Sequence, residues 1–381
     1  MEDTTRYFGC DVHKETLVIA IAQPGREQAH AIHRLTNSPE SVRRFFARAK
    51  RQGDLSVVYE AGPCGYALYR QLTRMGIPCQ VAAPSLLLAA PGDRVKTDRR
   101  DAVRLAEGLR AGQITAVRVP DETDEALRDL SRARGTARQD VTRIRHRISK
   151  LLLRLDQRPP TRMTAWTQRY RRWLERVELG HPALAIVLAE GLVQLAEAEA
   201  RLARLERALT RALAESEHAE LVSAYMAMRG IDRVTAAVLV TELGDLTRFA
   251  TPAQLMAYVG LTPSEHSSGA RRRQGRITRT GNSRARHAAV EASWHYRYPP
   301  RRSARVAARQ VGVPPEIVAI AWKAQHRLHQ RYRDLSGRGK PRGVVIVALA
   351  RELLGFLWAI AWQVRRLAER DQAGDLAATG D

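Results

Sequence analysis

The sequence has few of the features that mark secreted, zinc-binding or membrane-spanning proteins. Its 381 residues include three cysteines, none in a CxxC pair, so we expect reduced thiols in a cytosolic protein and no cysteine zinc site. Residues 1–6 do not resemble a signal peptide. The longest apolar run, residues 343–362, contains Arg351 and Glu352, and it therefore predicts a buried helix and no membrane span.

Acidic residues are also scarce relative to basic ones. The chain contains 63 Lys and Arg against 40 Asp and Glu, which gives a formal net charge of +23. Most of the basic residues are arginines, whose planar guanidinium suits bidentate contacts with phosphate. An excess of this size indicates the kind of partner and says nothing about the fold, and nucleic acid is the partner it favours.

The strands predicted at the start of the chain contain a carboxylate that needs an explanation. Tyr7–Ala22 consists of two short apolar runs around a polar break, and it predicts a hairpin of buried β-strands. Asp11 lies in the first run. Burying an ionised carboxylate is costly unless it is paired or bound to a cation, so we interpret Asp11 as a candidate metal ligand.

Strands and helices then alternate, and this alternation predicts an α/β sheet domain over residues 1–118. The further elements predicted are a strand at Ala29–Arg34, a helix that Ser38 caps and that continues to Lys50, a strand at Leu55–Glu60, a helix up to about Met75, a strand at Cys79–Ala83 and a helix that Thr97 caps.

Four carboxylates of this domain form one hypothesis. Asp11 lies in a strand, Glu60 ends a strand, and Asp98 and Asp101 are three residues apart on one helix face. Divalent cations prefer oxygen ligands, and two cations a few ångströms apart stabilise both the attacking and the leaving oxygen of a phosphodiester. Two simpler interpretations stay open, because Asp98 could only stabilise a helix N-terminus and Glu60 could be a solvated strand end.

A long helical arm is predicted over residues 119–218. Apolar residues at three-and-four spacing over 122–155, and again over 184–213, predict two amphipathic helices that pack as a coiled coil within the chain or with another copy. The connector, residues 158–176, interleaves aromatic and arginine side chains. It could contact nucleic acid or simply cap the arm.

A mostly helical C-terminal domain is predicted over residues 219–370, followed by a disordered tail at 371–381. Two helices around the turn at 230–232 match a helix-hairpin-helix pattern, although Asp232 replaces the usual second glycine. Leu261–His287 is expected to be loop-like. Helices are expected up to Trp294, over Pro314–Tyr332 and from Val344 onward.

Two sets of motifs, one in each half of the chain, occur in a fixed order. The first set is GCDVHKE at Gly9–Glu15, YEAGPCGY at Tyr59–Tyr66 and KTDRRDA at Lys96–Ala102. The second set, between Met228 and Ala289, is MRGIDRVTA, FATPAQLMAYVGLTPSEHSSG and GRITRTGNSRAR. Together they resemble the insertion-sequence 110 family of transposases. The resemblance implies an RNase H-like (RuvC-like) N-terminal domain whose DEDD tetrad maps onto Asp11, Glu60, Asp98 and Asp101.

The resemblance also implies the chemistry. The tetrad would bind Mg²⁺, or alternatively Mn²⁺, and a serine of the C-terminal domain would become linked to the DNA phosphate. By motif match that serine is Ser268, with Ser267 as the alternative. A hydroxyl needs a neighbouring base or metal to become a good nucleophile. Without the resemblance, Ser-Ser-Gly would be interpreted as a turn.

Arginines crowd the segment that follows Ser268, with little interleaved acid. Each can clamp a phosphate with two hydrogen bonds, so the segment predicts a grip on a nucleic-acid backbone without sequence readout. The predicted nucleic-acid-binding residues are Lys96, Arg271, Arg272, Arg273, Arg276, Arg279, Arg284 and Arg286. His13 and His266 are weaker candidates for general bases, because a lone histidine near a loop is more often a hydrogen-bonding neighbour.

The expected partners are DNA at the element ends and at the target, and further copies of the chain in a dimer or tetramer joined through the arm. The family resemblance adds a structured non-coding guide RNA. No membrane partner is expected, and the expected location is the bacterial cytoplasm at the nucleoid. The residues alone are also compatible with a RuvC-like nuclease acting on branched DNA, or with a non-catalytic DNA-binding accessory protein.

Overall fold

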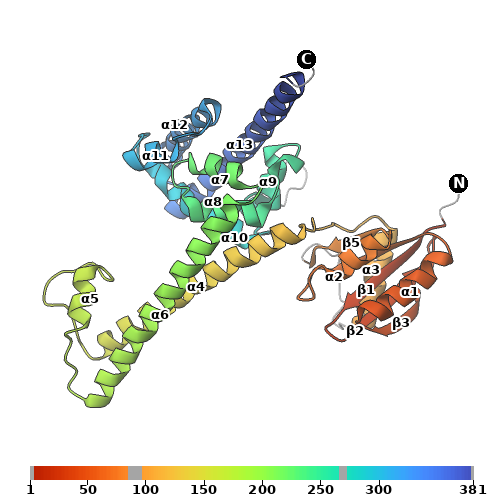
Figure 1. The fold of residues 1–381 in the computed structure, drawn as a ribbon, viewed down its shortest axis with the longest axis horizontal. Helices are drawn as coiled ribbons and strands as arrows, with labels where there is room; N and C mark the ends of the chain where they lie inside the picture. The colour runs from red at the N-terminus through yellow and green to blue at the C-terminus, as the bar shows by residue number, and fades with distance from the viewer. Residues whose placement is uncertain (1–3, 85–96, 266–272, 379–381) are drawn as a thin grey trace. The chain divides into compact units, whose positions relative to one another are not determined.

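The computed structural model describes residues 4–84, 97–265 and 273–378, and the chain divides into two compact units. The first unit is Met1–Pro120 and the second is Asp121–Asp381. Figure 1 shows the sheet of the first unit and the helices of the second.

A five-stranded mixed sheet is the centre of the first unit. Its strand order is β3-β2-β1-β4-β5, in which β1 to β3 are antiparallel neighbours, whereas β4 and β5 continue parallel to β1. The predicted hairpin is confirmed, since β1 and β2 pair from Tyr7 with Ala22 to Val12 with Leu17. The elements are β1 Arg6–Val12, β2 Thr16–Ala22, β3 His30–Thr36, α1 Pro39–Arg51, β4 Leu55–Glu60, α2 Ala67–Arg74, β5 Cys79–Ala82 and α3 Asp98–Arg110.

The two faces of the sheet enter different hydrophobic cores. Phe8 and Cys10 of β1 pack with α1 and α2, whereas Tyr7 and the β4 residue Val58 pack with α3. Residues two apart in a strand share a face. Asp11 of β1 therefore lies on the α3 face of the sheet, and so does Glu60 of β4.

The predicted helix caps are present in the first unit. Ser38 accepts a hydrogen bond from the backbone N–H of Ser41 at the start of α1, and Thr97 accepts one from Arg100 at the start of α3. Such caps satisfy N–H groups that have no partner within the helix, and they therefore define where each helix begins.

Helices make up most of the second unit, whose elements are α4 Glu122–Arg154, α5 Gln168–Leu174, α6 Pro182–Ala214, α7 Ala219–Met226, α8 Arg233–Leu243, η2 Leu246–Arg248, α9 Pro252–Tyr258, β6 Pro263–Glu265, β7 Gln274–Ile277, α10 Ser283–Ser293, η3 Trp294–Arg297, α11 Ala304–Arg309, α12 Pro315–Gly337 and α13 Arg342–Ala378. Both long helices predicted between residues 122 and 213 are confirmed.

The helices α4 and α6 lie side by side as an antiparallel pair (Figure 1). Arg145 pairs with Glu199 at 2.6 Å, and the earlier Arg134 pairs with the later Glu206. Arg171, on α5 of the connector, donates two further hydrogen bonds to Glu199, and these bonds are the largest influence lowering the pKa of that carboxyl. The connector is thus fastened to the arm, which supports the capping interpretation.

Helix α13 is long and apolar enough to cross a membrane by length and composition alone. Half of its most apolar window is nevertheless buried inside the protein. Leu349, Leu353 and Leu357 are fully buried in a core that also includes residues of α7, α8 and α12. This packing agrees with the buried helix that the sequence predicts.

Two expectations for the second unit differ from the structure. The segment Leu261–His287 is not all loop, because β6 and β7 pair as a short antiparallel hairpin and α10 already begins at Ser283. The two strands present mostly exposed or half-exposed polar residues, so they lack the apolar alternation by which strands are recognised. Helix α13 also continues to Ala378, through residues predicted to form a disordered tail.

A buried carboxylate joins three elements of the second unit. Glu242 of α8 has a side chain only 1% exposed, and Arg132 of α4 donates hydrogen bonds of 2.9 and 2.8 Å to its two oxygens. Asn282, which caps α10, donates a third bond of 2.7 Å. Burial raises the pKa of Glu242, but these bonds outweigh it and hold that pKa below its ordinary value.

Replacing Glu242 with glutamine is expected to destabilise the second unit by about 3 kcal/mol, because it leaves Arg132 without its carboxylate partner. Because the pKa of Glu242 is lower in the folded than in the unfolded state, its ionised carboxylate stabilises the fold at pH values above the ordinary glutamate pKa. This contribution is lost as the pH falls through the pKa of the folded state. The difference between wild type and Glu242→Gln should therefore shrink in acid. All six tryptophans lie beyond residue 120, so tryptophan fluorescence during urea unfolding follows this unit.

The control for this experiment is Glu369→Gln, which removes an exposed carboxylate paired with Arg365 on the same helix. It should change stability by less than about 0.5 kcal/mol. Equal effects of the two substitutions would contradict the role given to Glu242.

Candidate active site

Two of the four predicted carboxylates stand at the same edge of the sheet. β1 and β4 are parallel neighbours with Cys10 opposite Tyr59, and Asp11 and Glu60 each follow one residue later on the α3 face. Both line an open cleft of about 780 Å³ that also contains His13 and Asn37. The carboxyl ends of adjacent parallel strands thus converge there, at the position where ligand sites of α/β sheets usually form.

The other two carboxylates arrive on the first turn of α3. Asp98 and Asp101 follow the cap residue Thr97, and an acidic first turn suits the positive end of the helix dipole. Helix α3 lies directly on β1 at Gly9, where an added Cβ would come 2.1 Å from the Ala102 carbonyl oxygen. The absence of a side chain at Gly9 therefore allows the close approach between α3 and the strand that carries Asp11.

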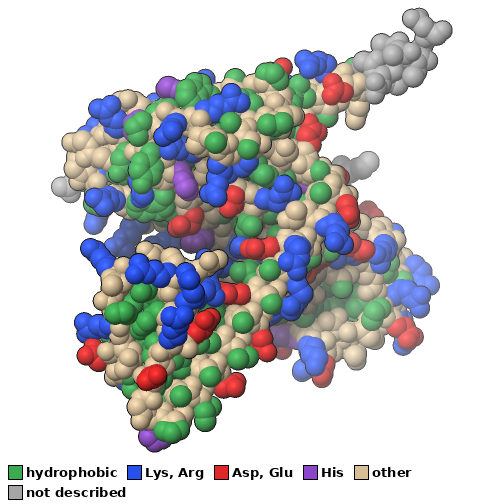
Figure 2. All heavy atoms as spheres, turned by 60° about the vertical axis from the view of Figure 1, so that its left-hand side comes forward, with side chains coloured by type: hydrophobic (Ala, Val, Ile, Leu, Met, Phe, Trp, Pro, Cys, Tyr) green, Lys and Arg blue, Asp and Glu red, His purple; other side chains and the backbone are tan. Residues whose placement is uncertain are grey.

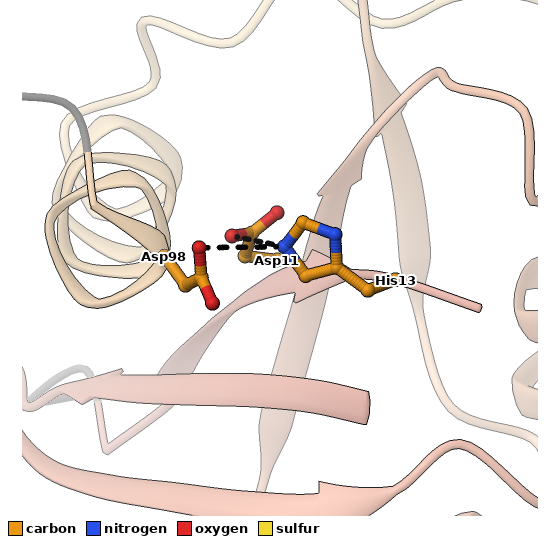
Figure 3. A group of neighbouring side chains, drawn as sticks. All are labelled: Asp11, His13 and Asp98. Atoms are coloured by element: carbon orange, nitrogen blue, oxygen red, sulfur yellow. Dashed lines mark hydrogen bonds and ion pairs between the residues drawn. The ribbon is translucent and has the colours of Figure 1, made fainter. Parts of the chain in front are cut away.

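Asp11, Asp98 and His13 meet in space, as Figure 3 shows. The Nε2 atom of His13 is 3.1 Å from Oδ2 of Asp11 and 3.5 Å from Oδ1 of Asp98. The Asp11 side chain is 18% exposed, whereas those of Asp98 and His13 are each 50% exposed. One wall of the group is therefore buried in the sheet, and the other is open to a substrate.

Burial and neighbouring charges both act on the Asp11 carboxyl. Burial raises the pKa of the Asp11 carboxyl above its ordinary value; His13 lowers it, and the neighbouring carboxylates of Asp98 and Asp101 raise it again. Arg104 lies 3.6 Å from Asp101. Clustered carboxylates are the oxygen donors that a hard divalent cation requires.

The predicted tetrad is thus brought together to different degrees. Asp11 and Asp98 share the histidine, Asp101 is near enough to raise the pKa of Asp11, and Glu60 lines the cleft with Asp11. His13 occupies the position of a hydrogen-bonding neighbour, which is the interpretation that the sequence favours for it. The sequence does contain a signal for this position, because His13 follows Asp11 by two residues, just after the end of β1.

The C-terminal part of the predicted site is only partly described. His266, Ser267, Ser268, Arg271 and Arg272 lie outside the described residues, and so does Lys96 of the first unit. The hairpin of β6 and β7 flanks that gap, with Glu265 paired to Gln274 across it. Arg273, Arg276 and Arg279 are exposed, and the last two line a cavity of about 780 Å³.

The remaining two arginines of the predicted grip have partners within the protein. Arg286 donates hydrogen bonds of 2.7 and 2.9 Å to the carbonyl oxygens of Val259 and Thr280, and burial lowers its pKa. Arg284 lies 3.9 Å from the buried Glu242. Their guanidinium groups therefore stabilise the turn before α10 and its first residues, and contact with a phosphate would compete with these interactions.

A second group of potential ligands lies in the other unit, where Asp124, Glu217 and His218 come together. The Asp124 oxygen is 2.5 Å from Nε2 of His218, a direct hydrogen bond between two largely buried side chains. This hydrogen bond holds the start of α4 against the residue before α7.

Two family models match the chain, one in each half. The DEDD transposase model of the insertion-sequence 110 type matches residues 8–155, which include all four carboxylates of the tetrad. The model described as transposase IS116/IS110/IS902 family matches residues 222–307. The order of the two matches is the order of the motif sets in the sequence.

Several proteins are similar over most of the chain. The putative transposase y4qE of Sinorhizobium fredii is 42% identical over 362 residues, which cover 94% of this chain and 89% of that protein. The transposase for insertion sequence element IS1533 of Leptospira borgpetersenii is 30% identical over 338 residues, or 88% and 97% of the two chains. A probable family 20 transposase of Pseudomonas aeruginosa is 27% identical over 341 residues. The chain therefore belongs to the IS116/IS110/IS902 family of insertion-sequence transposases, and it is a DNA transposase.

Proposed function

We propose that this transposase cleaves and exchanges DNA strands with a divalent metal held by Asp11, Glu60, Asp98 and Asp101. The observation that carries the proposal is the meeting of Asp11 and Asp98 from two different elements beside a cleft. Membership of the DEDD family implies dependence on a divalent metal. We take that metal to be Mg²⁺, with Mn²⁺ as the substitute, because both prefer carboxylate oxygens.

The donor set fits such an ion on chemical grounds. All four proposed ligands offer carboxylate oxygens, and Asp98 and Asp101 are near enough to Asp11 to raise its pKa. A bound divalent cation would supply charge neutralisation for the phosphodiester undergoing displacement. His13 would keep the Asp11 carboxylate oriented through the hydrogen bond of 3.1 Å.

We further propose an RNase H-like (RuvC-like) fold for the first unit. The strand order β3-β2-β1-β4-β5, three antiparallel strands followed by two parallel ones, supports this assignment. In the second unit we propose a coiled-coil arm over residues 119–218 and a C-terminal transposase domain over 219–370. The apolar stripe between α4 and α6 supports the arm.

Ser268 is the proposed nucleophile, with Ser267 as the alternative. Its Oγ would form a bond to the scissile phosphorus while the bond from phosphorus to the departing DNA oxygen breaks, and the hydroxyl proton would pass to a neighbouring base. The seryl phosphate would conserve the bond for rejoining. Exposed arginines after the serine, such as Arg273 and Arg276, would hold the backbone in place.

The proposal extends to partners and location. A structured non-coding RNA would supply the specificity, since the sequence contains no base-reading motif, and RNA-guided systems assign that role to base pairing. Strand exchange joins two DNA sites, so we propose a dimer or tetramer assembled through the arm. DNA as the substrate implies action at the nucleoid in the bacterial cytoplasm.

The test is to incubate the full chain, co-expressed with the non-coding region that flanks its gene, with element-end DNA and Mg²⁺. Wild type and Ser267→Ala are expected to give a protein–DNA adduct that survives denaturant, because the phosphate is covalently held. Ser268→Ala should give none. The measurement is the retarded band on a denaturing gel.

Other outcomes would point to other functions. Cleavage without an adduct that persists in Ser268→Ala would reject the serine and leave a nuclease that uses the tetrad alone. If the wild-type protein binds DNA but does not cleave it, the function favoured would be that of an accessory DNA-binding protein.

A further inference from the structure

A second basic surface begins at Arg297, after the predicted arginine grip that ends at Arg286. It is formed by η3, the segment that follows it, the start of α11 and the exposed side of α12. Six side chains define this aromatic–arginine surface: Arg297, Tyr298, Arg301, Arg302, Arg305 and Trp322. Figure 2 shows that Lys and Arg side chains are spread over the face in view, so positive charge alone does not define this surface, which also has the exposed rings of Tyr298 and Trp322.

The first ring, Tyr298, is 49% exposed. Arg297 lies 4.6 Å from the ring centroid, and it donates a hydrogen bond of 2.7 Å to the Tyr298 hydroxyl. Arg229 lies 6.0 Å from the same ring and donates a bond of 2.7 Å to the Pro299 carbonyl oxygen. The ring is therefore held in a fixed orientation by cations while half of its surface stays open.

The second ring, Trp322 of α12, is 44% exposed, and it makes an edge contact with His326 one turn later, at 4.7 Å between ring centroids. The buried Gln325 lies between these two positions in the sequence. Its Oε1 accepts a hydrogen bond of 3.1 Å from the backbone N–H of Arg301. Residues three apart share a helix face, so Trp322 lies on the side of α12 where Gln325 contacts the arginine segment.

The charge of this surface is uncompensated. In the described residues, no carboxylate lies within ion-pair distance of its four arginines or of the adjacent Arg229 and Arg309. The nearby Asp232 carboxylate accepts hydrogen bonds from the backbone and hydroxyl of Thr235 at the start of α8. The pKa of His295 is lowered first by burial and then by the charges of Arg229, Arg297 and Arg309. The contribution of the arginines reflects the positive potential of the surface.

We propose that the aromatic–arginine surface binds an unpaired DNA strand, with bases stacked on Tyr298 and Trp322 and phosphates held by the arginines. Arginine alone would suit duplex DNA equally well, but exposed flat rings gain stacking only from bases that are not already stacked in a duplex. Cleavage and exchange of strands by a DNA transposase produce such bases. The inference rests on the family assignment and not on the proposed metal site.

The test measures binding of the full chain to fluorescent DNA by anisotropy, in EDTA so that no metal chemistry takes part. Tyr298→Ala and Trp322→Ala are each expected to weaken binding of an unpaired thymidine 20-mer by about tenfold, the size of one lost stacking contact. The slope of affinity against salt should stay unchanged, because neither substitution removes a charge. Arg302→Ala should instead reduce that slope by about 0.7.

Matched controls separate this role from folding. Tyr298→Phe keeps the ring and should recover most of the affinity that Tyr298→Ala loses, whereas Val187→Ala, at an exposed apolar residue of α6, should bind like wild type. Thermal midpoints should be equal for all variants. Equal loss of affinity for duplex and unpaired DNA would overturn the proposal, as would wild-type binding by both alanine variants. An RNA 20-mer that binds much more tightly, through the same two rings, would overturn the assignment to DNA.

Discussion

Replacing Gly9 with alanine is expected to slow DNA cleavage by about a hundredfold, although Gly9 itself carries no functional group. The added Cβ would lie 2.1 Å from the Ala102 carbonyl oxygen and 2.3 Å from the Ala106 nitrogen, both backbone atoms of α3. Backbone in a helix cannot rotate away, so α3 must move outward by about 1 Å, since carbon atoms do not approach oxygen that closely. Asp98 and Asp101 would move with it.

Misplacement of catalytic groups by about 1 Å can cost about a hundredfold in rate, and overpacking costs about 1–3 kcal/mol in stability. The measurements are cleavage of element-end DNA and hydrogen–deuterium exchange of α3, which should increase in Gly9→Ala. The matched control is Gly62→Ala in the same cleft, where the nearest atom to an added Cβ is 3.9 Å away. Full cleavage by Gly9→Ala would show that the carboxylates of α3 are not needed.

Replacing Asp11 with asparagine is expected to reduce cleavage by at least about a thousandfold, because it removes a carboxylate that the proposed metal site draws from the sheet and whose side chain is 18% exposed. The same change should leave the metal-free protein folded. Asparagine keeps the shape of aspartate while it removes one of three clustered negative charges, so repulsion within the group falls.

The expected signature of Asp11→Asn is therefore a loss of metal response without a loss of fold. Ions that bind only the folded state raise the thermal midpoint, so Mg²⁺ or Mn²⁺ should raise it for wild type and not for the variant. Asp54→Asn, an exposed aspartate just before β4, is the control and should respond like wild type. If the variant still cleaves at the wild-type rate, the acidic group is not the catalytic centre.

Local patterns were enough to predict most elements of the first unit. Apolar runs broken at 13–15 predicted β1 and β2, and β4 extends over Leu55–Glu60 as expected. Ser38 and Thr97 predicted their helices because an N-cap acts through a neighbouring N–H group only three residues away. Interactions of this range are readable from a single sequence.

What the sequence could not predict depends on contacts between distant residues. Arg284 and Arg286 look like the other arginines of their run, yet their partners are Glu242 and the carbonyl oxygens of Val259 and Thr280. The β6 and β7 hairpin is too short and polar to leave a pattern. Likewise, the need for glycine at position 9 arises from α3, which lies about ninety residues later in the chain.

The burial of α13 has a consequence for how the protein is made. Because the ribosome synthesises the chain from its N-terminus, Leu349, Leu353 and Leu357 are among the last core residues to emerge, yet they complete the core that includes α7, α8 and α12. The second unit therefore cannot finish folding until α13 has been synthesised. A copy of the element that loses the 3′ end of this gene should yield a chain with an exposed, incomplete core, which proteases degrade, so decayed copies would be silenced at the protein level.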